Sequence, residues 1–246
     1  MTAPLVPLLP PIPPTTDLAE RERALGALQR EIGGCRACEQ AGYLACARPL
    51  AVSRGPATAR LMIVGQAPGH LTIERGIMFG GPSGVALERW LTLAGFAPGA
   101  LRRDVYLSAL TRCDPGRNMR GRGDRKPSPT EVALCRPWLE RELALVRPRA
   151  ILLVGGMAIE AFLGPSRLEE VVGSASERDG VTLLPMPHPS GVSRWLNDPA
   201  HQALLAHGLE RLSWLRAAWE AEGVAHTAYC DSSNEVSASK EIRSNG

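Results

Sequence analysis

Four of the six cysteines are spaced so that they could hold an inorganic centre. Cys35 and Cys38 form a Cys-x2-Cys pair, whereas Cys113 and Cys135 stand singly further along the chain. Four thiolates suit either a structural zinc ion or an iron–sulfur cluster. Zinc ribbons normally have two paired claws, but here 74 residues separate Cys38 from Cys113 and 21 separate Cys113 from Cys135. This spacing favours the cluster.

A second candidate site lies in the glycine-rich segment Gly65–Gly84, which reads GQAPGHLTIERGIMFGGPSG. Its Pro and Gly residues predict a turn directly after a buried strand and allow the backbone to approach a ligand closely. The segment lacks the Gly-Lys-Ser/Thr ending of a phosphate-binding P-loop. Phe79 is a bulky apolar residue among glycines, so it either fills the local core or offers a platform for a flat ring.

His188 stands between two prolines in the segment 184–197, LPMPHPSGVSRWLN. The prolines keep the backbone extended just past a strand end, which places the imidazole at the rim of the sheet with little freedom. Such an imidazole suits a hydrogen-bond donor aimed at developing negative charge, or it is a surface histidine in a stiffened turn. The following residues suit contacts with a nucleic acid: Ser190, Gly191, Val192, Ser193 and Arg194.

The segment Arg112–Lys126 carries six basic residues and two acidic ones, whereas the whole chain has a net charge of +3. A local basic loop on a nearly neutral body indicates a phosphate-rich partner, although a solvated loop of no function has the same composition. The candidate DNA contacts in this loop are Arg112, Arg117, Arg120 and Arg122.

These candidates must be positioned by a sheet flanked by helices, because short apolar runs alternate with amphipathic stretches. We expect strands at 60–65, 104–109, 150–155 and 181–185, and helices at 17–32, 83–94, 130–146, 157–163 and 199–222. The pattern predicts an α/β sandwich with a mostly parallel four-stranded sheet. Loops 66–82, 110–129 and 186–199 leave the carboxyl ends of strands and should converge on one site.

Composition limits the class of protein. The 246 residues are 44% hydrophobic and 22% charged, which excludes disorder throughout. The longest apolar runs are far shorter than the roughly 18 residues of a membrane span, and no basic region precedes an apolar stretch at the N-terminus. We therefore expect a cytoplasmic protein with reduced thiols, in which Cys46 is a buried thiol and Cys230 a tail residue.

We predict three regions along the chain. Residues 1–16 hold six prolines and are expected to form a disordered arm. Residues 17–225 form a single domain, and residues 226–246, which are polar and lack apolar periodicity, are expected to be a disordered tail.

The order GQAPG, F-x-G-x-S-G, a strand followed by RC-P, a later cysteine, a further strand and HPS resembles the uracil-DNA glycosylase superfamily. The match is to its iron–sulfur branch, families 4 and 5, and covers about Cys35 to Leu215. It implies a three-layer α/β/α sandwich and a [4Fe-4S] cluster on Cys35, Cys38, Cys113 and Cys135. It also implies that a flipped base stacks on Phe79 and that His188 bonds its O2.

The resemblance further implies that the turn Gly65, Gln66, Ala67, Pro68 and Gly69 lines the base pocket. Two positions depart from family 4. Gln66 replaces the usual Glu, and Ala109 replaces an Asn that reads the uracil edge, as in family 5. Ala109 cannot make that check, so base discrimination should be looser, or should depend on backbone amides and Ser108.

We therefore expect a monomeric, monofunctional glycosylase that flips uracil, or another deaminated base, out of DNA and hydrolyses its glycosidic bond. In this hypothesis His188 and Gln66 are the catalytic residues. Two alternatives remain: a non-catalytic protein that binds damaged DNA in the same pocket, and a zinc-stabilised interaction module.

Overall fold

The computed structural model describes residues 17–50, 55–119, 123–190 and 194–241, with side chains as far as residue 222. The predicted N-terminal arm therefore lies outside the described residues. So do five of the expected DNA contacts: Arg120, Arg122, Gly191, Val192 and Ser193.

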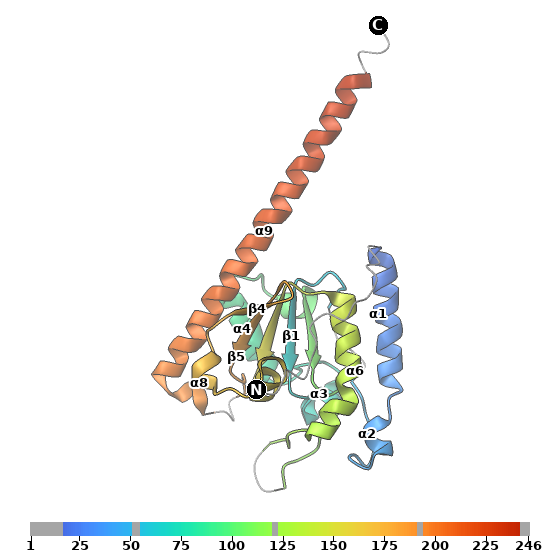
Figure 1. Ribbon diagram of the computed structural model, residues 1–246, viewed down its shortest axis with the longest axis vertical. Helices are drawn as coiled ribbons and strands as arrows, with labels where there is room; N and C mark the ends of the chain where they lie inside the picture. Colours follow the sequence, from blue (N-terminus) through green and yellow to red (C-terminus); the bar gives the residue numbers. More distant parts are fainter. Residues whose placement is uncertain (1–16, 51–54, 120–122, 191–193, 242–246) are drawn as a thin grey trace.

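A five-stranded sheet forms the centre of the molecule, with the strand order β2-β1-β3-β5-β4 (Figure 1). The four parallel strands are β1 (Leu61–Gly65), β2 (Val105–Ala109), β3 (Ala150–Val154) and β5 (Val181–Met186), and they confirm the expected α/β sandwich. The fifth, β4 (Ser176–Arg178), is antiparallel to β5. This strand consists of three polar residues, two of them exposed, so the sequence contains no apolar run that predicts it.

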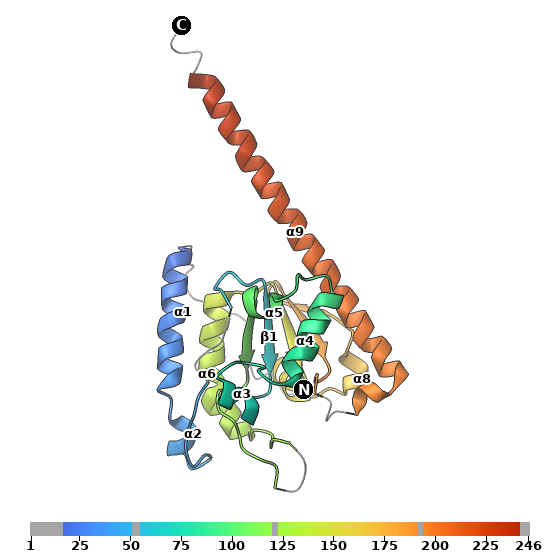
Figure 2. The same cartoon turned by 180° about the vertical axis from the view of Figure 1, so that it is seen from behind.

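The strands bury alternate side chains on two faces, which gives the molecule three layers. On one face Met62, Val64 and Tyr106 pack in a cluster with residues of α1 (Leu18–Gly33), α6 (Pro129–Val146) and α7 (Gly156–Leu163). On the other, Leu61, Ile63 and Leu107 pack with α4 (Pro82–Leu93), α5 (Ala100–Arg103) and α9 (Pro199–Glu241). Figures 1 and 2 show α1 and α6 on one side and α4 and α9 on the other.

Shorter helices lie in the connections: α2 (Ala37–Gln40), α3 (His70–Arg75), α8 (Leu168–Val171) and the 3-10 turn Trp195–Asn197. Helix α9 begins at the predicted place but continues to Glu241, beyond the expected end at Glu222. The added length includes residues 226–241, which contain no proline to stop a helix. Within the described residues, no helix combines the length and apolar character needed to span a membrane.

Candidate functional site

The ring of Phe79 lies against the last residue of β1. A Cβ atom on Gly65 would come 3.0 Å from Phe79 Cζ, so a larger residue at this position would crowd the ring. Gly65 pairs in register with Ala109 of β2, and Ala109 belongs to the same apolar cluster that Phe79 packs against. The strand ends therefore present an aromatic ring beside residues with little or no side chain.

His188 lies over the end of β3. A Cβ atom on Gly155, the residue after β3, would come 3.2 Å from His188 Cδ2. Strand β3 is the direct neighbour of β1, with Val64 opposite Leu153. The imidazole and the aromatic ring, which are far apart in sequence, therefore lie at adjacent strand ends.

Ser190 determines which nitrogen of His188 carries the proton. The backbone N–H of Ser190 donates to His188 Nδ1 over 3.2 Å, and the Ser190 hydroxyl lies 2.8 Å from the same nitrogen. Since a backbone N–H can only donate, Nδ1 accepts, and a neutral imidazole then carries its proton on Nε2. Burial lowers the pKa of His188 below its ordinary value, which favours this neutral form. From the sequence we expected Ser190 to contact DNA, and no sequence pattern indicated its hydrogen bond with His188.

The turn after β1 is held by the chain that follows β2. The N–H of Leu110 donates to the Gly65 carbonyl over 2.9 Å, and the N–H of Thr111 donates to the Gln66 carbonyl over 3.3 Å. In the rest of the turn Ala67 is half-buried and Pro68 is buried. The backbone of the predicted pocket wall is thus fixed by an extension of the β1–β2 ladder.

The basic loop packs against the end of this turn. Asp124 Oδ2 lies 2.8 Å from the position that a Cβ atom on Gly69 would occupy. His70, the next residue, has its Nδ1 atom 3.7 Å from the Asp114 carboxylate and its Nε2 atom 3.0 Å from Glu74. The first two of the three expected loops therefore meet, and these acidic residues lie beside the turn.

Two predicted site residues have a different role in the structure. The Ser108 hydroxyl donates to Glu142 Oε2 over 2.7 Å and accepts from Arg112 Nη1 over 2.9 Å. Arg112 is 1% exposed and forms an ion pair with Glu142, which is fully buried. The prediction that Arg112 contacts DNA is therefore wrong, as is the prediction that the Ser108 side chain reads the base. Ser108 is the β2 neighbour of Ala109, so its side chain lies on the opposite, α6 face of the sheet.

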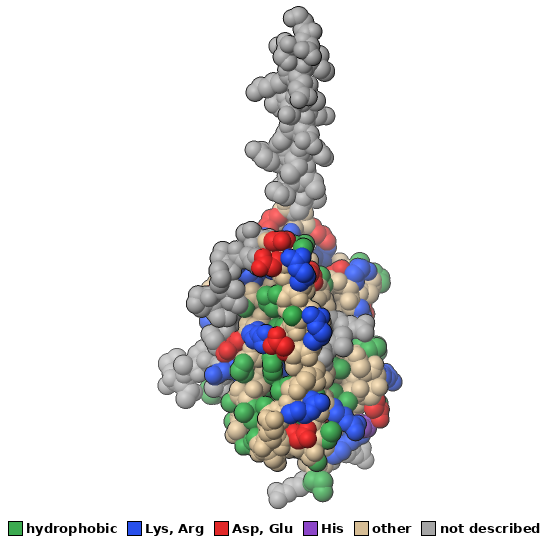
Figure 3. Space-filling model, turned by 90° about the vertical axis from the view of Figure 1, so that its right-hand side faces the viewer, with side chains coloured by type: hydrophobic (Ala, Val, Ile, Leu, Met, Phe, Trp, Pro, Cys, Tyr) green, Lys and Arg blue, Asp and Glu red, His purple; other side chains and the backbone are tan. Residues whose placement is uncertain are grey.

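The remaining described arginines of the basic loop differ in exposure. The side chain of Arg117 is 67% exposed and lies 3.8 Å from Asp124. Arg125 donates two hydrogen bonds of 2.7 Å to Glu131, which lower the pKa of that carboxyl to about 2. Arg194, in the third expected loop, is exposed. Figure 3 shows basic side chains interspersed with acidic ones on the α1 side of the molecule, so charge on that face is mixed.

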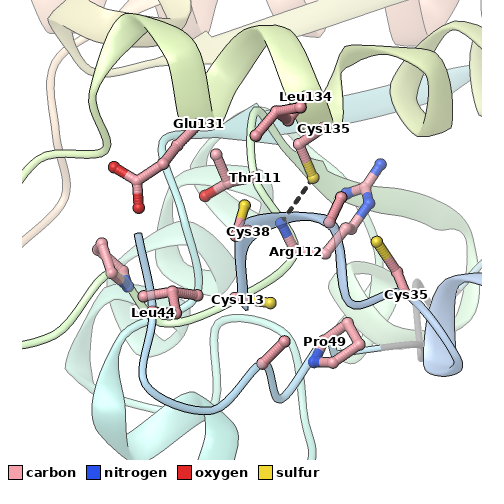
Figure 4. Close-up of a pocket in the computed structure, with 13 residues that line it drawn as sticks. Cys35, Cys38, Leu44, Pro49, Thr111, Arg112, Cys113, Glu131, Leu134 and Cys135 are labelled. Carbon is pink, nitrogen blue, oxygen red and sulfur yellow. Dashed lines mark hydrogen bonds between the residues drawn. The ribbon is translucent and has the colours of Figure 1, made fainter. Parts of the chain in front are cut away.

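The four predicted cysteine ligands line one small cavity of about 20 Å³. Cys35 follows α1, Cys38 lies in α2, Cys113 follows β2 and Cys135 lies in α6. Figure 4 shows their sulfur atoms grouped around this space, with the backbone N–H of Arg112 donating to Cys135 Sγ over 3.3 Å. We call these four residues the cysteine site. Cys46, in contrast, is exposed, so its expected burial is wrong.

The donor set of the cysteine site fits an iron–sulfur cluster. Burial, together with the neighbouring sulfurs, raises the pKa of Cys113 to about 12; burial also raises the pKa of Cys135 to about 11 and that of Cys38. Among the described residues, no three His, Cys, Asp or Glu side chains are gathered closely enough to hold one metal ion. Thiols spread around a common cavity suit a cluster, in which each thiolate binds its own iron atom.

The fold and the site together define an α/β protein with an aromatic ring and an imidazole at the carboxyl edge of its sheet, where α/β proteins commonly bind their ligands. The family model of the uracil DNA glycosylase superfamily matches residues 52–221, and the chain belongs to this superfamily. It is 30% identical over 182 residues to a type-4 uracil-DNA glycosylase of Archaeoglobus fulgidus, covering 69% of this chain and 83% of the relative.

The chain is similar to both type-4 and type-5 uracil-DNA glycosylases, as two further relatives show. A type-4 uracil-DNA glycosylase of Thermotoga maritima is 26% identical over 178 residues, which cover 71% of this chain and 85% of the relative. A type-5 uracil-DNA glycosylase of Pyrobaculum aerophilum is 33% identical over 150 residues, covering 55% of this chain and 63% of the relative.

Proposed function

We propose that this protein is a DNA repair glycosylase that removes uracil from DNA and leaves an abasic site. The observation that carries the proposal is the placement of Phe79 against Gly65 and of His188 against Gly155, at adjacent strand ends. Membership of the superfamily and the names of the relatives support it.

The base must first leave the helix, because the glycosidic bond cannot be reached inside the stack. Flipping costs a few kcal/mol, least for a mispaired base such as uracil opposite guanine. The ring of Phe79 offers the flipped base a stacking surface. Phosphate contacts offset part of the cost, and the candidates for them are the exposed Arg117 and Arg194 together with Arg120, Arg122 and residues 190–193.

Cleavage of the C1′–N1 bond leaves its electron pair on uracil and an electron-deficient carbon on the sugar. Negative charge then spreads to uracil O2, where the Nε2–H of a neutral His188 donates a hydrogen bond. One such donor contributes about 2.7–4 kcal/mol in comparable sites. Water adds hydroxide to C1′, and the remaining proton finally neutralises N1 of the uracil anion.

Gln66 orients the attacking water in this proposal, and Ala67, Pro68 and Gly69 shape the pocket around it. Neither Gly65–Gly84 nor the segment 184–197 contains a lysine, so the sugar has no amine to form a Schiff base and the enzyme is monofunctional. Ala109 presents only a methyl group to the base. Selection at that edge is therefore left to backbone amides, and we include other deaminated bases in the substrate range.

The cysteine site holds a [4Fe-4S] cluster through Cys35, Cys38, Cys113 and Cys135. When bound, the cluster supplies cross-links between the α1–α2 segment, the chain after β2 and α6, and no chemistry at the sugar. We also propose that the protein acts as a cytoplasmic monomer on uracil-containing DNA.

An excision assay tests the activity. Wild-type protein is incubated with DNA that carries uracil, hypoxanthine or xanthine, in paired and unpaired contexts, and with a thymine control. We expect alkali-labile sites at uracil and none at thymine. Tight binding to uracil-DNA without any abasic product over hours would refute the enzyme and indicate a binding protein.

Iron content and absorbance test the cofactor separately. We expect a brown protein with four irons per chain and a Cys135→Ser variant that loses colour and iron. Cys46→Ser is the matched control, because Cys46 is exposed and lies outside the cysteine site, so it should keep both. A colourless wild-type protein with one zinc per chain would contradict the cluster.

A further inference from the structure

The backbone of Phe79 has an unusual conformation. Its φ angle is +51°, in the left-handed region that bulky residues rarely adopt. Such a conformation persists only where the surrounding structure holds it, and it is often found where a side chain must have one particular direction. The contacts that hold Phe79 therefore bear on the direction of its ring.

Arg102 makes the first of these contacts from α5, on the strand-entry side of β2. One guanidinium nitrogen donates to the carbonyl of Met78, and the other donates to the carbonyl of Phe79 over 2.9 Å. Met78 itself is 2% exposed and belongs to the core on the α4 side. A planar guanidinium fork thus joins two consecutive carbonyls, which fixes the orientation of the peptide groups on each side of Phe79.

Gly84 makes the second contact, from the first turn of α4. A Cβ atom at this position would lie 1.9 Å from the Phe79 carbonyl oxygen and 3.2 Å from Arg102 Nη2. The carbonyl is therefore enclosed between the backbone of α4 and the guanidinium. Arg75 adds a third constraint, because it donates to the carbonyl of Gly80, the next residue.

We propose that Arg102 is a positioning residue for base excision: it holds Phe79 in the left-handed conformation that lays its ring on Gly65. This inference rests on the proposed function, in which the flipped base stacks on that ring. In this proposal Arg102 acts on excision through the backbone of Met78 and Phe79, so its contribution to excision depends on the Phe79 side chain. A preset ring needs no reorganisation when the base arrives, which favours the excision step.

A double-mutant cycle in the full chain tests this dependence. Single-turnover excision of uracil is measured for wild type, Arg102→Gln, Phe79→Ala and the double variant. We expect Arg102→Gln to lower the rate constant about 10-fold in the wild-type background and less than about twofold in Phe79→Ala. Arg102→Lys, which keeps one charged donor, should recover part of the loss. Arg103→Gln is the matched control, because Arg103 is the exposed neighbour and pairs with Asp104.

The possible results separate the inference from the proposed function. Equal losses in both backgrounds, or no loss with Arg102→Gln, would overturn the positioning role. Full activity of Phe79→Ala would instead refute the stacking surface, and with it the basis of the inference. A crystal structure of Arg102→Gln gives a readout independent of activity: we expect Phe79 to leave its positive φ, and an unchanged ring position would overturn the proposal.

Discussion

Phe79 is surrounded by backbone carbonyls and glycines, whereas the cysteine site is bordered by a pair of charged side chains. The Phe79 ring occupies space that a side chain at residue 65 would need. Arg102 donates hydrogen bonds to the carbonyls of Met78 and Phe79. The four cysteines instead line a cavity with Glu131, whose charge is balanced by Arg125. The first region depends on close packing of backbone and ring, and the second combines four thiols with a paired carboxylate and guanidinium.

Arg112 connects these two regions. Its backbone N–H donates to Cys135 Sγ over 3.3 Å, while its guanidinium donates to the Ala109 carbonyl over 3.1 Å and pairs with Glu142. Arg112 therefore contacts both a residue of the cysteine site and the end of β2. We therefore predict that breaking the buried ion pair of Arg112 acts mainly on stability and that changes around Phe79 and His188 act mainly on excision.

The largest effect is expected for Glu142→Gln, which leaves the buried Arg112 cation without its carboxylate. Breaking a buried ion pair in this way costs about 3–5 kcal/mol. Chemical unfolding measures the loss, and iron content shows whether it extends to the cysteine site. Glu140→Gln is the matched control, because Glu140 lies on the same helix in a partly exposed pair with Arg136. Equal small losses in both variants would contradict the charge-based account.

His188→Ala comes next and should act on excision with little change in stability. Loss of one hydrogen-bond donor at the developing anion lowers the rate constant by about 10²–10³-fold. Single-turnover excision measures it, and a binding assay with uracil-DNA should show similar affinity. His207→Asn, an exposed histidine on α9, serves as the control and should retain wild-type activity. A His188→Ala variant as active as that control would remove His188 from the mechanism.

The pH dependence should follow the neutral form of His188. Burial lowers its pKa below the ordinary 6.5, so the neutral imidazole predominates at pH 6.5 and above. Protonation at Nδ1 would place a proton against the Ser190 N–H, which donates to this atom. The excision rate constant should change little from pH 8 to 7 and should fall about tenfold per pH unit below the lowered pKa. A decline that already begins above pH 7 would disagree with this assignment.

The smallest effect is expected for Arg117→Gln. Arg117 is exposed on the basic loop, so its removal should weaken DNA binding alike for all sequences and reduce the salt slope of log K by about 1. Arg23→Gln on α1 is a matched exposed control that should leave the slope unchanged. A normal slope for Arg117→Gln would exclude this side chain as a phosphate contact.

The sequence predicted the parts that depend on periodicity and local turn chemistry. The four parallel strands and the long helices follow from apolar runs of the right length, whereas β4 is too short and too polar to produce such a signal. Positions that depend on tertiary packing could not be predicted. The density of charges in the segment predicted an exposed Arg112, but its side chain is buried and paired with Glu142, which is distant in sequence.

Contacts that depend on tertiary packing were equally hard to predict around the cysteine site and Phe79. Residue type and spacing predicted a common site for Cys35, Cys38, Cys113 and Cys135, but only the Cys35–Cys38 pair is a local pattern, and the fold brings the other two to the same cavity. The left-handed φ of Phe79 and its contact with Arg102, 23 residues away, had no local pattern to indicate them.

A crystal structure of the protein with an abasic DNA and free uracil tests the central claim most directly. The account predicts the uracil ring stacked on Phe79, with its O2 atom within hydrogen-bonding distance of His188 Nε2. Uracil bound elsewhere, or bound on Phe79 with its O2 atom turned away from the imidazole, would contradict it.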